Sequence, residues 1–584
     1  MFVRNLICLL IAVTPGLAQT KKPFDVVEST IQEMRRAMET GQVTSRELVT
    51  AYLTRIGLYE DKLHCIITVN PNVLAEADER DRERKQGRLR GPLHGIPIAL
   101  KDNILTYDIV TTGGALAFAG YTPPYDATLV KNLRDSGAVI IAKTGMTELA
   151  NWIAGAPTPM PGNYNAVRGF GYNPYDPRRD PRDGNDDGRP VLTTGGSSSG
   201  VGTAANFWGA NVGTETSGSI LSPANQNMLA AVKPTVGRIS RYGVIPITAD
   251  QDTAGPMART VTDAAILLGA LEGASPDPND VATNACKPPA DRDYTPFLKE
   301  DGLKGMRIGI PRAFFYDPFT PPSRGQTPAP TVTPGSAPPP GRRGGFGGGG
   351  LNPEQKRLMT EAIEILKQQG AEIIDPADIP SVVNKDPDQN FLLWGTCGGI
   401  TTNRGRDANC SVVFKYGMKR DFNAWLATLG PAAPVKTLTE LRQWNLTHTN
   451  GGSIRFGQSL LDSSDEMNLV ADKARYEADR AKDLELSAKQ GLDAVMKAQR
   501  LDAILFPGAN GASIAAKPGY PTVIVPFGMV PNTQGGAFPQ GFEPKPSPYG
   551  VSFTGLACSE PNLLKMAYAF EQATKRRVKP ASVP

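Results

Sequence analysis

Two segments rich in glycine and serine, together with one lysine, carry the residue types most capable of chemistry in this chain of 584 residues. Residues 193–200 read Thr-Thr-Gly-Gly-Ser-Ser-Ser-Gly, and residues 213–220 read Gly-Thr-Glu-Thr-Ser-Gly-Ser-Ile. A phosphate-binding loop would need a lysine after its last glycine, and residues 193–200 have none there. The first segment alone would be typical of a flexible linker. A serine in either segment is a nucleophile, however, if a nearby base accepts its proton.

The base expected for such a serine is Lys101 rather than a histidine. None of the three histidines lies within the two segments (His64, His94 and His448). Lys101 directly follows residues 96–100, an apolar run that predicts a buried strand. Burial disfavours the charged ammonium form, so a lysine at the end of this strand can be neutral and accept a proton. Without the serine segments, Lys101 would more simply be a surface lysine or an ion-pair partner of Asp102.

Four segments in a fixed order resemble the amidase signature family of serine hydrolases. They are residues 95–103, 193–200, 213–220 and 231–240. Further similar segments follow over most of the chain, at residues 142–144, 148–150, 173–177, 255–260 and 519–522. Thr214-Glu215-Thr216 is most similar to the peptide-amidase-like branch of that family. The resemblance implies hydrolysis of a linear amide C–N bond, with no cofactor and no metal ion.

The resemblance also implies a Ser-Ser-Lys triad. Ser219 matches the nucleophile that forms the acyl-enzyme, and Lys101 matches the general base. Ser197 matches the bridging serine that relays a proton between them, and it would follow a cis peptide bond after Gly196. The expected oxyanion hole consists of the backbone N–H groups of Thr216, Ser217, Gly218 and Ser219. Backbone donors suit this task because they are held in place before charge develops.

Three features depart from the family pattern. Ser217 stands where the family usually has glycine, and Leu221 stands where it usually has arginine. Ser197 and Ser219 are also two residues closer in sequence than is usual for the family. This shortening leaves Ser199 as the alternative to Ser197 for the bridging position.

The elements that position these residues are expected to alternate between strands and helices. Apolar runs predict strands at residues 96–100, 139–142, 306–310, 503–506 and 522–525. Helical spacing predicts helices at residues 44–59, 351–369 and 466–499, the first opened by a capping box of Thr44 and Glu47. The fold class expected is therefore α/β. With the resemblance, residues 24–584 should form a single large domain whose mixed, twisted β-sheet is covered by helices on both faces.

Two segments break this alternation. Residues 317–350 are about half glycine and proline, which predicts a disordered surface insert. Residues 158–190 are dense in Gly, Pro, Asn and Asp and are expected to help shape the substrate pocket. Within them, residues 183–188 match the start of a calcium-binding EF-hand loop. Its twelfth position is Thr194 instead of glutamate, so we expect a solvated acidic loop and no metal ion.

The N-terminus predicts export. Residues 1–18 have the pattern of a signal peptide cleaved after Ala18, so a secreted or periplasmic protein is expected. No later run is apolar enough to cross a membrane. The net charge of +4 is near balance and predicts no nucleic-acid partner. The cysteines are widely spaced, and Cys397 with Cys410 is the pair most expected to form a disulfide.

The function expected from these observations is hydrolysis of a small-molecule or peptide amide by a monomer or homodimer. The substrate candidates are aliphatic or aryl amides, amino-acid amides and C-terminally amidated peptides. Two alternatives remain. One is a non-catalytic binding protein on the same fold, and the other is the glutamine-hydrolysing subunit of a tRNA amidotransferase. The predicted signal peptide argues against the second alternative.

Overall fold

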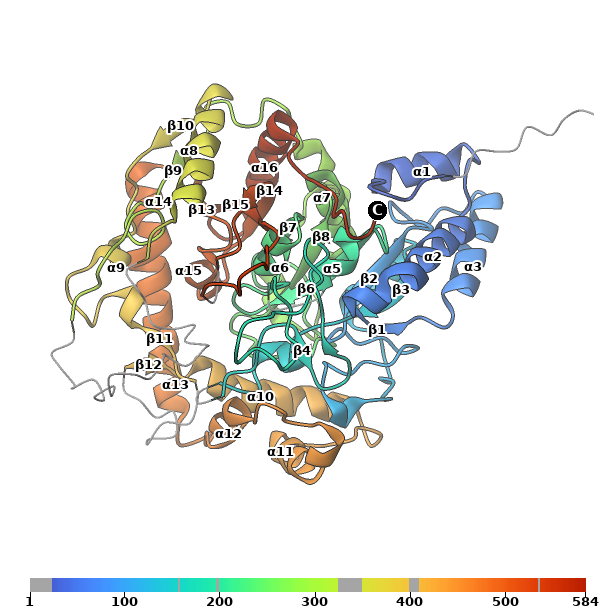
Figure 1. Ribbon diagram of the computed structural model, residues 1–584, viewed down its shortest axis with the longest axis horizontal. Coiled ribbons are helices and arrows are strands. Elements are labelled where there is room, and N and C mark those ends of the chain that lie inside the picture. The colour runs from blue at the N-terminus through green and yellow to red at the C-terminus, as the bar shows by residue number, and fades with distance from the viewer. Residues whose placement is uncertain (1–23, 156–157, 196–198, 324–348, 399–408, 534–535) are drawn as a thin grey trace, which may run out of the picture.

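The computed structural model describes residues 24–155, 158–195, 199–323, 349–398, 409–533 and 536–584. An 11-stranded mixed β-sheet runs through these residues in the strand order β1-β3-β2-β6-β8-β7-β14-β15-β13-β9-β10 (Figure 1). Its strands are β1 (Ile66–Val69), β2 (Pro97–Lys101), β3 (Val139–Thr144), β6 (Ala210–Glu215), β7 (Ala230–Lys233), β8 (Thr253–Ala258), β9 (Arg307–Gly309), β10 (Glu372–Ile374), β13 (Ala503–Pro507), β14 (Thr522–Val530) and β15 (Ser547–Thr554). Two short pairs lie outside the sheet, β4 (Tyr164–Asn165) with β5 (Gly169–Phe170) and β11 (Gly395–Thr396) with β12 (Cys410–Ser411).

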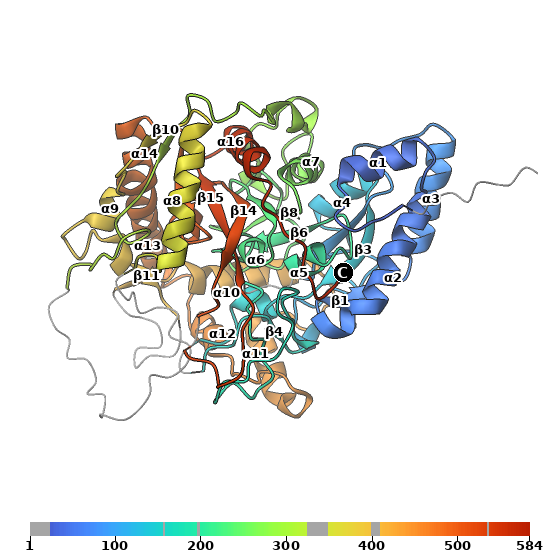
Figure 2. The same ribbon diagram turned by 45° about the horizontal axis from the view of Figure 1, so that its top comes forward.

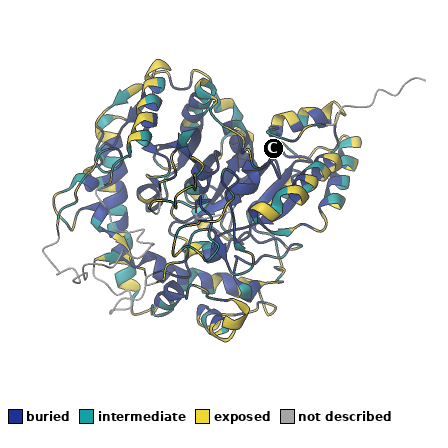
Figure 3. Cartoon of the chain, in the orientation of Figure 1, coloured by how far each residue is buried: buried dark blue, intermediate teal, exposed yellow. Residues whose placement is uncertain are grey.

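Sixteen α-helices surround the sheet in the described part of the chain. They are α1 (Ile31–Glu39), α2 (Ser45–Leu63), α3 (Val73–Lys85), α4 (Thr128–Asp135), α5 (Ser199–Ala204), α6 (Leu221–Gln226), α7 (Val261–Leu271), α8 (Pro353–Gln368), α9 (Pro380–Val383), α10 (Val413–Thr428), α11 (Leu438–Thr447), α12 (Ser459–Asp465), α13 (Lys473–Leu484), α14 (Asp493–Gln499), α15 (Ala512–Ala516) and α16 (Glu560–Thr574). Helices α7, α16 and α8 lie side by side (Figure 2). The strands are mostly buried, whereas the outer sides of α2 and α3 are exposed (Figure 3).

Strand β14 shows that helices cover both faces of the sheet. Val523 and Val525 belong to the main apolar core, where Phe570 of α16 packs. Ile524, between them, belongs to a smaller core with Leu221 and Ala224 of α6. Because successive side chains of a strand point to opposite faces, α16 and α6 cover opposite faces of the sheet. The predicted α/β domain with a mixed, helix-covered sheet is therefore confirmed.

The predicted elements coincide with observed ones, with one interruption. The five predicted strands overlap β2, β3, β9, β13 and β14, and the capping box of Thr44 and Glu47 opens α2. The helix predicted at residues 466–499 begins only at Lys473. It is divided into α13 and α14 by a π-helical segment, Glu485–Leu492, in which Gly491 leaves the helical backbone conformation.

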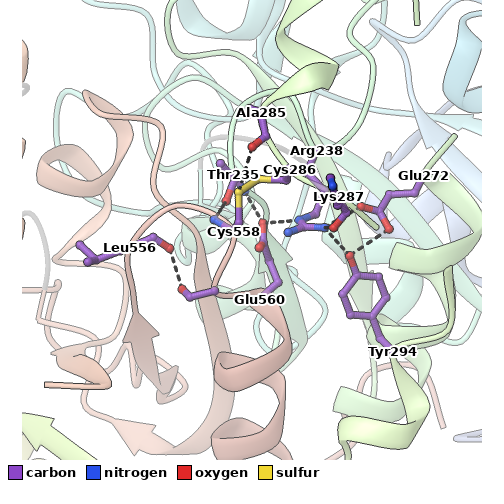
Figure 4. Close-up of a disulfide and its surroundings, with 11 residues drawn as sticks. Thr235, Arg238, Glu272, Ala285, Cys286, Lys287, Tyr294, Leu556, Cys558 and Glu560 are labelled. Carbon is purple, nitrogen blue, oxygen red and sulfur yellow. Dashed lines mark hydrogen bonds and ion pairs between the residues drawn. A yellow bond between two sulfur atoms is a disulfide. The ribbon is translucent and has the colours of Figure 1, made fainter. Parts of the chain in front are cut away.

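The described residues contain two disulfides, one local in sequence and one long-range. Cys397–Cys410 links the ends of β11 and β12, as predicted. Cys286–Cys558 was not predicted, because 272 residues separate its cysteines. Close to this second bridge, Arg238 forms buried ion pairs with Glu272 and Glu560, each at 2.7 Å (Figure 4). Together, the bridge and the ion pairs hold the start of α16 against the segment that follows α7.

Several predictions from the sequence fall outside the described residues. Residues 1–18 and the central part of the predicted insert, residues 324–348, are among them. The described ends of the insert lie together, since the Gly350 N–H donates to the Phe314 carbonyl oxygen at 2.7 Å. Among the described helices, none has the length and apolar character needed to span a bilayer.

Candidate active site

Lys101 is the last residue of β2 and is 1 % exposed. Strand β2 lies between β3 and β6 and is parallel to both. The Lys101 Nζ donates a hydrogen bond to the carbonyl oxygen of Thr214 on β6 at 3.0 Å. Burial lowers the pKa of Lys101 to about 8, although the nearby Glu215 and Asp252 carboxylates favour its ammonium form. The neutral amine required of a general base is therefore accessible near neutral pH.

The turn that carries Ser219 follows β6, the neighbour of β2. Leu100 pairs with Val212 in the parallel register, so both strands end at the same edge of the sheet. Gly218 has a φ of +97°, a conformation that glycine adopts without steric cost. Within the described residues, the N–H groups of Ser217, Gly218 and Ser219 donate to no acceptor. The turn therefore offers the free backbone donors that an oxyanion hole needs, one strand away from Lys101.

The Glu215 carboxylate holds the end of this turn in place through hydrogen bonds. Its carboxylate accepts hydrogen bonds from the N–H groups of Ile220 at 2.7 Å and Leu221 at 3.0 Å, directly after Ser219. Glu215 is buried, so these bonds are shielded from water. The sequence marked Glu215 only by resemblance, and its positioning role was missed. An acidic residue a few positions before a short helix was the available signal.

The loop of residues 247–252, directly before β8, holds Thr216, the first residue of the turn. The Thr216 hydroxyl bonds the Asp252 carboxylate, and the Gln251 side-chain amide donates to the Thr216 carbonyl oxygen at 3.1 Å. The other Asp252 oxygen accepts from the N–H groups of Ile247 and Thr248, both at 2.9 Å. Burial raises the pKa of Asp252 to about 7, and the hydrogen bonds oppose this rise. The sequence did not predict these contacts.

The bridging serine cannot be assigned from the described residues. Ser197 and the Gly196–Ser197 peptide bond lie outside them, so the choice between Ser197 and Ser199 remains a prediction. Ser199 is described and buried at the start of α5. On the other side of the gap, Gly195 has a φ of +86°, and a Cβ there would lie 2.4 Å from the carbonyl carbon of Ser222. Gly195 therefore approaches the backbone of α6, which follows Ser219, as closely as glycine allows.

Two asparagines tie the serine segment to α6. The Asn173 side-chain amide donates to the carbonyl oxygens of Thr193 and Gln226, both at 2.8 Å. The Asn227 amide donates to the carbonyl oxygen of Pro223 at 2.9 Å and to that of Thr194 at 3.3 Å. Asn173 belongs to the loop of residues 158–190, so this loop supports Thr193 and α6 through hydrogen bonds. Among the described residues, the wall of the cavity beside the turn contains none from this loop, so its expected part in shaping the pocket stays a prediction.

Burial alone does not distinguish Lys101 from two other lysines. Lys143 and Lys233 are also fully buried, and burial lowers the pKa of each to about 8. Lys143 donates to the Ile104 carbonyl oxygen at 2.6 Å, and Lys233 donates to the Tyr520 carbonyl oxygen at 2.6 Å. Lys101 differs from both because its strand lies directly beside the strand that leads to Ser219.

A cavity of about 610 Å³ opens beside the turn, with Ser217 and Gly218 in its wall.

In the loop of residues 158–190, the Asp180 and Asp187 carboxylates pair with Arg182 and Arg189. Across the described residues, no group of three or more acidic, histidine or cysteine side chains is arranged to hold a metal ion.

Comparisons with known proteins show which proteins this chain is similar to. The profile of the family described as Amidase matches residues 47–328. A probable amidase of Arabidopsis thaliana is 32% identical over 564 residues, covering 95% of this chain and 92% of that protein. The structure of the native peptide amidase of Stenotrophomonas maltophilia is similar with a TM-score of 0.76 and 34% identity, covering 96% and 99% of the two chains. One component of the glutamyl-tRNA(Gln) amidotransferase of Chloroflexus aurantiacus is 39% identical, but over only 59% of this chain and 60% of that protein.

Proposed function

Because this chain belongs to the amidase family and hydrolyses an amide C–N bond, we propose that it does so through a seryl acyl-enzyme formed on Ser219. Lys101 is the general base. It acts through a bridging serine, for which Ser197 is the preferred candidate and Ser199 the alternative. The observation that carries this proposal is the parallel pairing of β2 and β6, which brings a buried lysine of lowered pKa and the turn of Ser219 to one sheet edge.

The proposed reaction has two halves. In the first half, neutral Lys101 takes a proton from the bridging serine as that serine takes the proton of Ser219, and the Ser219 oxygen bonds the amide carbon. The negative charge on the carbonyl oxygen is held by the free N–H groups of the turn. The proton then passes back to the leaving nitrogen as the C–N bond breaks. In the second half, water gives a proton to the same relay as its oxygen bonds the acyl carbon. The ester bond to Ser219 then breaks, the relay returns the proton to the Ser219 oxygen, and the acid product leaves and ionises to the carboxylate.

The departures from the family pattern are compatible with this chemistry. Ser217 is exposed at the wall of the cavity, so its side chain points away from the packed core. Leu221 is buried in the small core with Ile220 and Ala224, and its N–H is held by Glu215. The carboxylate of Glu215 therefore fixes the turn without help from an arginine at position 221.

Labelling with a fluorophosphonate probe tests the proposal against a non-catalytic binding protein, because only an activated serine reacts. We expect the wild-type protein to be labelled at Ser219 and to hydrolyse members of an amide panel. Ser219→Ala and Lys101→Ala should both remain folded by circular dichroism and lose labelling and turnover. Labelling that survives in Ser219→Ala would overturn the assignment of the nucleophile.

The substrate proposed is a small-molecule or peptide amide, and C-terminally amidated peptides are the leading class. The similarity to a peptide amidase over nearly the whole chain supports this choice. A role as one component of a tRNA amidotransferase is less favoured, since those relatives match only about 60% of the chain. Turnover of an amidated peptide by the isolated chain, with neither tRNA nor a second protein present, would distinguish the two.

We also propose that the protein is exported, after cleavage behind Ala18. The two disulfides support this location, because such bridges persist mainly in oxidising compartments. Cell fractionation with N-terminal sequencing of the mature protein tests the proposal. Recovery of uncleaved protein in the cytosol would contradict it and would revive the amidotransferase alternative.

A further inference from the structure

The cavity beside the oxyanion turn is lined by polar side chains that carry no charge. Among the described residues in its wall, the side chains are those of Asn, Gln, Ser, Thr and Tyr together with small apolar residues. Its volume of about 610 Å³ lies within the usual range of small-ligand sites. Such sites are mostly apolar, so the abundance of carboxamide groups points to a ligand with many hydrogen-bonding groups.

Two of these carboxamides have their oxygen atoms engaged and their NH₂ groups free. Asn225 Oδ1 accepts from the Gly550 N–H at 2.8 Å, and Gln226 Oε1 accepts from the Ser547 hydroxyl at 2.8 Å. A backbone N–H can only donate, which fixes the orientation of the Asn225 amide. Both side chains are 9 % exposed, and neither NH₂ group has an acceptor within the described part of the chain. Both residues line the cavity, so it contains two largely buried donors without partners.

Asn532, which also lines the cavity, is oriented in the opposite sense. Its Nδ2 donates to the Val191 carbonyl oxygen at 3.0 Å, which leaves Oδ1 as the free group. Asn532 is 7 % exposed, and its Oδ1 takes no hydrogen bond from a described residue. The cavity thus presents two donors from the end of α6 and one acceptor from the segment that follows β14.

This set of groups is complementary to a peptide main chain, which carries one acceptor and one donor for each residue. Unpaired buried donors and acceptors are costly, so they favour a ligand that satisfies them. From this pattern we infer that Asn225, Gln226 and Asn532 are specificity-determining residues, which bind the peptide groups on the acyl side of the cleaved amide. The substrate carbonyl oxygens lie toward the two NH₂ groups, and a substrate N–H lies toward Asn532. The inference rests on the proposed function, because the cavity shares Ser217 and Gly218 with the oxyanion turn.

The first test compares two amides that differ in peptide groups. N-acetyl-alanyl-alanine amide has two further peptide groups on its acyl side, and propionamide has none. The variants are Gln226→Met, an uncharged change of similar shape, and Asn225→Asp, which keeps the oxygen that accepts from Gly550 and removes the NH₂ donors. We expect each variant to reduce the ratio of kcat/KM values, peptide amide over propionamide, by about tenfold. The ratio cancels any effect of either change on the shared oxyanion turn.

Asn284→Asp is the matched control, because it makes the same chemical change at an exposed position outside the cavity. It should leave the ratio unchanged. An equal loss of kcat/KM for both amides in Gln226→Met and Asn225→Asp would overturn the inference, even if turnover itself is confirmed.

A binding measurement separates this inference from the proposed function. Titration calorimetry follows N-acetyl-alanyl-alanine amide binding to Ser219→Ala, with and without Gln226→Met. We expect Gln226→Met to weaken binding by about tenfold. If the wild type hydrolyses no amide but this weakening is seen, the proposed function fails and the cavity assignment stands. Equal binding by both proteins, or no binding to Ser219→Ala, would overturn the cavity assignment.

Discussion

The Lys101 Nζ donates a hydrogen bond to the carbonyl oxygen of Thr214 at 3.0 Å, across the parallel pairing of β2 and β6. Either protonation state of the amine can make this bond, so it holds the side chain in place while the proton moves. Thr214 lies five residues before Ser219. The base is therefore positioned by the same strand that presents the nucleophile.

The first prediction concerns the pH dependence of turnover. Lys101 must be neutral to act as a base, and burial lowers its pKa to about 8. The plot of kcat/KM against pH should therefore rise from acid toward alkaline pH with a midpoint near 8. Initial rates on an amidated peptide between pH 6 and 9.5 give this profile. A profile without any rise over this range would contradict the role of Lys101.

The second prediction is that Lys101 lowers the free energy of unfolding, although turnover requires it. Its pKa in the folded protein lies below the ordinary value of 10.5, so folding opposes its protonation below pH 10.5. Lys101→Met removes this penalty but also the bond to Thr214. We expect a net gain of about 1–2 kcal/mol in the free energy of unfolding at pH 7, with complete loss of turnover. Urea unfolding measures the gain.

The exposed Lys497 supplies the control for this experiment. Lys497→Met should change the free energy of unfolding by less than about 0.5 kcal/mol and leave turnover intact. If Lys101→Met were less stable than the wild type, the contacts of the lysine would stabilise the fold by more than the burial of its charge destabilises it.

The third prediction concerns the charge of Glu215. This carboxylate favours the ammonium form of Lys101. Glu215→Gln keeps an oxygen that accepts from Ile220 and Leu221 but removes the charge, so the pKa of Lys101 should fall further. The acid limb of the kcat/KM profile should then move to lower pH by several tenths of a unit. Glu215→Ala, which also frees the turn, should lower kcat by about 10²-fold.

Glu47→Gln is the control for the charge change, because Glu47 lies in the exposed capping box at the start of α2. Its pH profile should match that of the wild type. If Glu215→Gln moved the limb to higher pH, the electrostatic role given to Glu215 would be wrong.

The sequence predicted five strands of the sheet and missed the others, among them several that contain glycine or proline. Strand β8 includes Gly255 and Pro256, which are typical of turns. In the structure a Cβ at Gly255 would lie 2.2 Å from the Val232 carbonyl oxygen, so close packing of β8 against β7 accounts for the glycine. The strand propensity of a residue carries no information about a neighbour that is distant in sequence, such as Val232.

The candidate site could be predicted only where its residues lie in local motifs. Lys101 and Ser219 lie in such motifs, so the sequence names both as candidates, and their roles stay predictions. The Asp252 contact depends on the antiparallel pairing of Glu215 with Thr253, which places Asp252 opposite Thr216. Without β8 in the predicted sheet, nothing in the sequence related these two residues.

The fourth prediction concerns Gly195. A Cβ at this position would lie 2.4 Å from the Ser222 carbonyl carbon, and the φ of +86° also disfavours other residues. Gly195→Ala should therefore destabilise the protein by about 2–3 kcal/mol and displace the serine segment from α6. Gly184→Ala is matched in backbone, with a φ of +78°, but it has open space around it. It should cost only about 1 kcal/mol and leave kcat unchanged, as judged by urea unfolding and turnover.

The fifth prediction compares the two disulfides. Cys286–Cys558 closes a loop with a sequence separation of 272 residues, and Cys397–Cys410 closes one of 13. In the chain-entropy account, a longer loop restricts the unfolded state more. The double variant Cys286→Ser/Cys558→Ser should therefore lose about 2–3 kcal/mol more stability than Cys397→Ser/Cys410→Ser. Chemical unfolding under non-reducing conditions measures both losses.

The surroundings of the long-range bridge strengthen this expectation. Arg238 pairs with Glu560 at the start of α16 and with Glu272 after α7, and Tyr294 donates to Glu272 at 2.9 Å (Figure 4). These buried charges depend on the approach of the same two segments that Cys286 and Cys558 join. A bridge that can be removed with no greater loss of stability than the short one would mean that the ion pairs hold α16 in place without it.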